Sequence, residues 1–196
     1  MTLGKSVGLG VAGFATASLV VFGFWAVAGR AMYRAFGEAG FYSVCVVLFI
    51  GLGTLLLRSL ARQLSFARFA TLFTGAFVAY AVSWCAAWFL VRGRAGEWVG
   101  SLAGAVAFAL VIGLALRAGR WIPLMATVLF LTHSVGYFAG SLAYDLLKGA
   151  SGLAAKLAWG LCYGIGMGAG IGFVFHKCQD PSEVKQAEPP RRRRST

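Results

Sequence analysis

The stretch Trp159–Phe173 reads WGLCYGIGMGAGIGF and carries six glycines. They fall into two rows, Gly160, Gly164, Gly168 and Gly172 at every fourth position, and Gly166 with Gly170 as a shorter second row. Residues four apart share one face of an α-helix. Rows of small residues let helix backbones approach closely enough for van der Waals attraction to hold them together in lipid. The stretch therefore predicts a helix that packs through a flat glycine face.

This face needs a partner helix. Gly136 and Gly140 form a further G-x-x-x-G step on the preceding hydrophobic run, and we expect them to be its mate. A second copy of the chain is the alternative partner, which would give a homo-oligomer. A nucleotide site is not indicated, because the G-x-G-x-x-A fingerprint of such sites follows a strand and opens a soluble helix.

The chain around this stretch is too apolar for a water-soluble protein. Of its 196 residues, 59% are hydrophobic and 12% are charged, which is too little charge to cover a soluble globule. Six runs contain no Asp, Glu, Lys or Arg: 6–29, 39–57, 69–91, 98–116, 121–144 and 157–176. Each has 19 to 24 residues, and a helix of about 20 apolar residues crosses the hydrocarbon core of a bilayer.

These runs predict an all-α integral membrane protein, a polytopic bundle of six transmembrane helices joined by short loops. Strands of a membrane barrel would instead be runs of about 10 residues that alternate in polarity. The six helices form one domain, residues 1–176. Residues 177–196 are polar and contain prolines, so we predict a disordered, basic cytoplasmic tail.

The first run leaves an alternative for the number of helices. Lys5, the apolar core and the small residues Ala26, Val27 and Ala28 resemble a signal peptide with its cleavage site. Cleavage would leave five helices. We favour an uncleaved helix, because a run of 24 uncharged residues exceeds the usual signal-peptide core of about 7–15 residues.

Basic residues predict the orientation. Six crossings place both termini on one side, and that side carries 12 of the 18 Lys and Arg residues. Because basic residues stay on the cytoplasmic side, we predict a bacterial inner-membrane protein with both termini in the cytoplasm. Six of the 12 lie in the tail, and four of these are consecutive arginines that either anchor this topology or contact anionic lipid: Arg191, Arg192, Arg193 and Arg194. Nucleic acid is not an expected partner, since no folded basic face accompanies them.

Three of the runs carry polar and aromatic side chains that share a helix face. His133 lies near the midplane of the membrane, where polar groups are costly and often functional. Spacings of three and four residues give the rows His133, Tyr137, Ser141 and Tyr144; Tyr80, Trp84 and Trp88; and Lys156, Trp159 and Tyr163. All three rows run towards the non-cytoplasmic side, so they predict a ligand pocket there with His133 at its floor. Interfacial anchoring of Trp and Tyr is the structural alternative.

No cofactor or metal ion is predicted. The four cysteines lack the spacing of a zinc or redox pair: Cys45, Cys85, Cys162 and Cys178. Haem held between helices would need a second axial histidine inside the membrane, and His176 lies at its edge.

One short motif has an enzymatic counterpart. The stretch 133–140 reads HSVGYFAG, and its H-x-x-G-x-x-x-G pattern resembles the histidine helix of rhomboid intramembrane proteases. The resemblance covers eight of the 196 residues and implies a serine nucleophile, for which Ser101 is the candidate. Rhomboids carry that serine two spans before the histidine in a G-x-S-G setting, whereas Ser101 lies one span before His133 and directly follows its glycine. An intramembrane hydrolase is therefore our third hypothesis only.

The sequence predicts a non-catalytic membrane component that assembles through helix packing. The alternative is a channel or transporter-like protein that binds or passes a small neutral, aromatic or anionic solute. Coupling to cations is disfavoured, because no carboxylate lies inside a run. A cavity of about 300 Å³ or more at the polar rows would favour the alternative.

Overall fold

A computed structural model describes residues 1–179, and every regular element within them is helical. The long helices are α1 (Leu3–Leu56), α2 (Phe66–Val91), α3 (Gly93–Ala115), α4 (Ile122–Leu147) and α5 (Gly152–Lys177), with two 3₁₀ turns, η1 (Arg58–Ala61) and η2 (Gly119–Trp121). Five helices in the described part of the chain are long and apolar enough to cross a membrane. The predicted all-helical class is thus confirmed. The predicted contacts of Arg191, Arg192, Arg193 and Arg194 lie outside the described residues.

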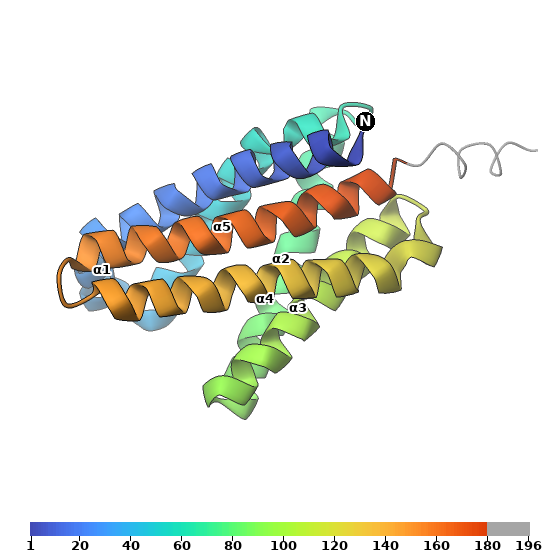
Figure 1. The fold of residues 1–196 in the computed structure, drawn as a ribbon. Coiled ribbons are helices and arrows are strands. Elements are labelled where there is room, and N and C mark those ends of the chain that lie inside the picture. The colour runs from blue at the N-terminus through green and yellow to red at the C-terminus, as the bar shows by residue number, and fades with distance from the viewer. Residues whose placement is uncertain (180–196) are drawn as a thin grey trace, which may run out of the picture.

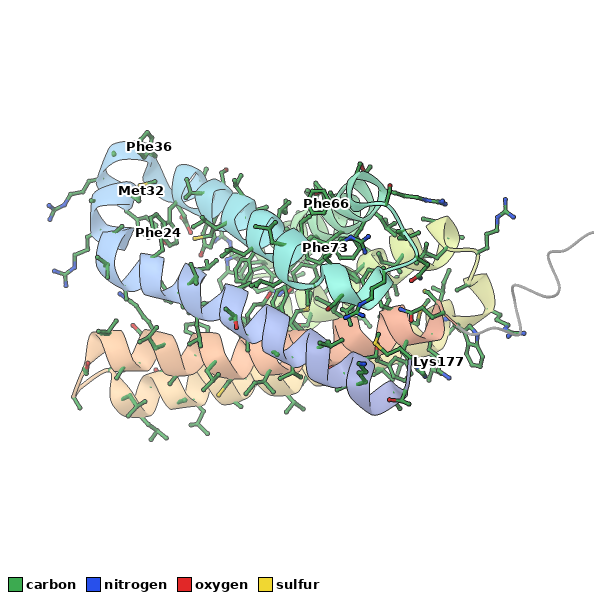
Figure 2. All side chains as sticks on the ribbon, turned by 90° about the horizontal axis from the view of Figure 1, so that it is seen from above. Phe24, Met32, Phe36, Phe66, Phe73 and Lys177 are labelled. Carbon is green, nitrogen blue, oxygen red and sulfur yellow. The ribbon has the colours of Figure 1, made fainter. Side chains whose placement is uncertain are left out.

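The first two hydrophobic runs are joined in α1, which folds back on itself at Gly37. This glycine has φ 68° and ψ −174°, a backbone region open essentially to glycine alone. The rings of Phe14 and Phe49 stack with 5.4 Å between their centroids, although a straight helix of that length would place them about 50 Å apart. Residues 3–36 and 38–56 therefore form two arms side by side, with Phe36 at the turn between them (Figures 1 and 2).

Gly37→Ala should destabilise the protein by about 1–3 kcal/mol, because alanine is strained in this backbone region. Gly51→Ala in the same helix is the matched control. A Cβ added at either position would meet nothing within 4 Å, so the comparison isolates the backbone conformation. The control should melt at or above the temperature of the parent, since alanine favours helix over glycine. Equal melting temperatures of the two variants in detergent would contradict a glycine-dependent turn.

Helix α5 lies between α4 and the first arm of α1, and α2 forms a hairpin with α3 (Figure 1). The hairpin crosses the α1, α4 and α5 layer at an angle, and its end at residues 91–93 points away from that layer. A column of phenylalanine rings fills the centre. The Phe49 ring lies 5.6 Å from that of Phe77, which lies 5.9 Å from Phe73. This column packs α2 against α1. Beyond it, towards residues 91–93, the α2–α3 hairpin separates from the other helices.

Apart from the α2–α3 connection, the connections between helices lie at two ends of the bundle. At one end, the Lys177 Nζ lies 4.4 Å from the centre of the Trp121 ring, and the Gln179 amide donates to the Leu60 carbonyl. The start of α1 lies at this end too, and Lys177 marks it in Figure 2. The α1 turn and the α4–α5 connection lie at the opposite end (Figure 1). The start and the end of the described chain therefore lie together.

Candidate functional site

Helices of the same chain cover the glycine face of α5. Its four-glycine row meets the first arm of α1, and a Cβ on Gly164 would lie 2.6 Å from the Ala15 Cα. Ser18 Oγ donates to the Gly160 carbonyl at 2.7 Å. Ser6 Oγ donates to the Gly172 carbonyl at 2.9 Å. The backbones of α1 and α5 are thus in direct contact along the row.

The second row of α5 meets α4. A Cβ on Gly166 would lie 2.8 Å from the Gly136 Cα, and one on Gly170 would lie 3.0 Å from the Leu129 Cα. Gly140 packs against the backbone and ring of Trp159. Gly136 therefore faces Gly166 of the second row and Gly140 faces Trp159, so neither meets the four-glycine row that we expected them to meet. Spacing shows which residues share a face, but not which neighbouring helix covers it.

The three polar rows meet where α2, α4 and α5 approach each other. The Tyr80 hydroxyl oxygen lies 2.7 Å from His133 Nε2 and 3.4 Å from the Tyr163 hydroxyl oxygen. All three side chains are buried. Each comes from a different helix, so the structure joins one residue from each row in a single hydrogen-bonded chain.

Further aromatic contacts extend from this chain towards the α1 turn. The Tyr137 ring lies 6.0 Å from Trp84 and 5.8 Å from Trp159. The Tyr137 hydroxyl donates to Glu97 at 3.4 Å, and Arg94 lies 3.8 Å from the same carboxylate. The Tyr137 hydroxyl is thus bonded to the Arg94–Glu97 ion pair at the start of α3.

A cavity of about 240 Å³ lies in front of these rings. Twelve of its seventeen lining residues are aromatic: Phe22, Trp25, Tyr33, Phe41, Tyr42, Phe49, Phe77, Tyr80, Trp84, Tyr137, Trp159 and Tyr163. The other five are Val21, Cys45, Val46, Ala81 and Cys85, so no charged residue lines it. This volume is smaller than the cavity of about 300 Å³ or more that we expected of a solute site, which is the lower end of the range for drug-sized molecules. It suits a smaller ligand.

Burial shows which end of the cavity is open. Tyr33 and Tyr42 are the lining residues with exposed side chains, and both lie beside the turn of α1. At the other end, Phe49, Tyr80 and Tyr163 are buried. The cavity therefore opens near the turn and closes against the hydrogen-bonded chain.

Five of the ten predicted pocket residues line the cavity: Tyr80, Trp84, Tyr137, Trp159 and Tyr163. His133 lies behind Tyr80 rather than at the floor. Trp88 stacks on Trp84 at 5.9 Å, and Tyr144 stacks on Trp25 at 6.3 Å. Lys156 Nζ lies 5.0 Å from the centre of the Trp25 ring. These residues and Ser141 do not line the cavity.

The second arm of α1 supplies a wall of the cavity that was not predicted from the sequence. Tyr42, Cys45, Val46 and Phe49 line the cavity and follow the spacing i, i+3, i+4, i+7 of one helix face. That pattern is visible in the sequence. It does not stand out, because the run 39–57 is apolar on all sides.

The structure does not pair the residues of the rhomboid-like motif. His133 Nε2 is bonded to Tyr80, and neither His133 Nδ1 nor Ser101 Oγ has a hydrogen-bond partner within residues 1–179. Among the same residues, no three His, Cys, Asp or Glu side chains are placed to hold a metal ion. The aromatic cavity is therefore the feature from which a function can be argued.

Comparison with known proteins adds no assignment. No protein-family model, curated protein or solved structure matches this chain.

Proposed function

We propose that this chain is a six-span integral membrane protein that binds a small, neutral, largely apolar molecule in the aromatic cavity. The observation that carries the proposal is the convergence of α1, α2, α4 and α5 on one uncharged cavity with aromatic walls. Buried ring faces favour an apolar or aromatic ligand. An ion would lose its hydration there without a charged partner.

Six crossings follow if each arm of α1 spans the membrane. The two arms contain charge-free runs of 24 and 19 residues, 6–29 and 39–57, and the turn between them carries charged residues. With an even number of crossings, both termini lie on one side. The connections at the terminal end of residues 1–179 carry basic residues without an acidic one: Lys5, Arg58, Arg62, Arg68, Arg117, Arg120 and Lys177. This charge supports a cytoplasmic location for both termini in a bacterial inner membrane, with Arg191 to Arg194 as a further anchor.

The closed inner end favours binding over passage. Phe49, Phe77, Tyr80 and Tyr163 are buried at this end, so the cavity is a blind site rather than a pore. Assembly of several copies through the glycine face is less favoured, because α1 and α4 of the same chain cover both glycine rows.

Native cysteines allow a test at the cavity itself. Cys45 and Cys85 line it, whereas Cys162 and Cys178 do not. The test ligand is the apolar ring compound durene (tetramethylbenzene), added to the protein in nanodiscs. The alkylation rates of Cys45 and Cys85 should fall as the site fills, by about fivefold near saturation. Alkylation of the other two should not change. Undiminished rates at Cys45 and Cys85 would contradict a ligand site.

Filling the cavity should abolish this protection. Ala81 lines the cavity, so the ring of Ala81→Phe can occupy it at little cost to stability. Durene should then leave the rates at Cys45 and Cys85 unchanged. Ala86→Phe is the matched control, since Ala86 lies on the exposed face of the same helix, and it should keep the protection of the parent protein. Protection that survives in Ala81→Phe would place the site elsewhere.

A further inference from the structure

The hydrogen-bonded chain at the inner end leaves one donor unused. If the His133 proton is on Nε2, the imidazole donates to Tyr80 and Tyr80 donates to Tyr163, so the Tyr163 O–H has no acceptor. If Tyr80 donates to Nε2 instead, the Tyr163 oxygen lies 3.4 Å from that of Tyr80. That distance is longer than the usual O–H···O bond of about 2.5–3.0 Å. The Nε2–H tautomer therefore leaves the Tyr163 hydroxyl hydrogen free for another acceptor, whereas in the other tautomer Tyr163 can donate it to Tyr80 over this long distance.

Two more lining residues have donors without a partner. The indole N–H groups of Trp84 and Trp159 are buried and make no hydrogen bond within the described part of the chain. Leaving a buried donor unpaired is costly, and lipid offers no acceptor in compensation. Both indole edges face neighbouring helices rather than the cavity, since Cδ1 of Trp84 lies against Gly100 and Cδ1 of Trp159 against Gly140. The hydroxyl of Tyr163, which lines the cavity, is the donor to consider for a ligand.

The charges near the cavity favour a neutral acceptor over an anionic one. Lys156 lies against the Trp25 ring and does not line the cavity. The nearest carboxylate, Glu97, accepts from Tyr137 and would repel an anion. A complementary ligand has acceptor oxygens but no net charge.

The walls select for a flat shape. The Phe49 ring stacks on Phe14 on one side of the cavity, and the Trp84 ring stacks on Trp88 on another, so both rings are held in place. Fixed rings pack best against a further planar ring, in offset or edge-to-face contact.

We infer that the ligand is a planar aromatic carbonyl compound of the quinone type, with a carbonyl oxygen that accepts a hydrogen bond from Tyr163. This inference rests on the proposed function, because it requires that the cavity holds a ligand. The closed inner end positions the oxygen, and the aromatic walls hold the ring. A saturated acyl chain would fill the same space but would accept no hydrogen bond from Tyr163.

Two ligands of similar shape, one with carbonyl oxygens and one without, show whether a carbonyl strengthens binding. Durene and duroquinone (tetramethyl-para-benzoquinone) carry the same methyl groups, and only the quinone carries oxygens. In nanodiscs, the slowed alkylation of Cys45 and Cys85 gives a dissociation constant for each compound, with ligand concentrations expressed per lipid. The constant for duroquinone should be about tenfold lower than that for durene. In Tyr163→Phe, which keeps the ring and removes the hydroxyl, the two constants should differ by less than about twofold. Tyr144→Phe, outside the cavity lining, should keep the full preference.

The outcomes separate the two proposals. Equal binding of both compounds to the parent protein, or a preference that survives in Tyr163→Phe, overturns the inference and leaves the binding function standing. Absence of protection by either compound overturns both. A preference for duroquinone that is lost in Tyr163→Phe and kept in Tyr144→Phe supports the inference.

Discussion

Gly164→Leu should prevent the bundle from folding, and this is the largest effect that we expect from a single substitution. A Cβ at this position would lie 2.6 Å from the Ala15 Cα and 2.9 Å from the Ser18 Cβ. The nearest of these atoms belongs to the backbone of α1, so no side-chain rotation makes room. Relief requires that α1 and α5 separate along their length. We expect a loss of about 3 kcal/mol or more in unfolding free energy.

The control for this substitution is Gly8→Leu. A Cβ on Gly8 would meet nothing within 4 Å, and this residue is exposed on the first arm of α1. Its leucine should leave the yield of monodisperse protein and the melting temperature near those of the parent, whereas Gly164→Leu should aggregate or melt at a much lower temperature. If the two variants behave alike, α5 does not pack against α1 through this face.

The two glycine rows show what sequence spacing can establish about this fold. Spacing by four identified the glycines that share a face, because this follows from helix geometry alone. It left open which helix lies on each face, and the structure places α1 on one row and α4 on the other. That choice depends on how the other helices pack around α5. Nothing local to α5 encodes it.

The candidate site shows the same division. Tyr80, His133 and Tyr163 stand out in the sequence because polar groups are rare inside membrane spans. Cys45, Val46 and Phe49 do not, since apolar side chains facing lipid and apolar side chains facing a cavity have the same composition. Distinguishing them requires the neighbouring helices. The sequence therefore indicates the polar end of the site, and only the fold shows its apolar wall.

Gly104 on α3 is a residue of the site that the sequence analysis did not identify, and Gly104→Leu should abolish ligand protection. A Cβ on Gly104 would lie 2.6 Å from Cδ2 of the Tyr80 ring and 3.2 Å from the Tyr80 carbonyl oxygen. The ring must then move towards the cavity that it lines, and its hydroxyl leaves His133. We expect durene to leave the alkylation rates of Cys45 and Cys85 in this variant unchanged, so that the slowing of about fivefold in the parent is lost. Overpacking should also lower the unfolding free energy by about 1–3 kcal/mol.

The control for Gly104→Leu separates a lost site from general damage to the α2–α3 hairpin. Gly75 lies in the same hairpin, and its added Cβ would meet only Val111, at 4.0 Å. Gly75→Leu should therefore keep both the melting temperature and the protection. A purely structural role for Gly104 would lower the melting temperature while Cys45 and Cys85 stayed protected, which would show that the Tyr80 ring does not bound the ligand. Loss of protection in folded Gly104→Leu, with Gly75→Leu unaffected, would show that α3 positions the binding site without lining it.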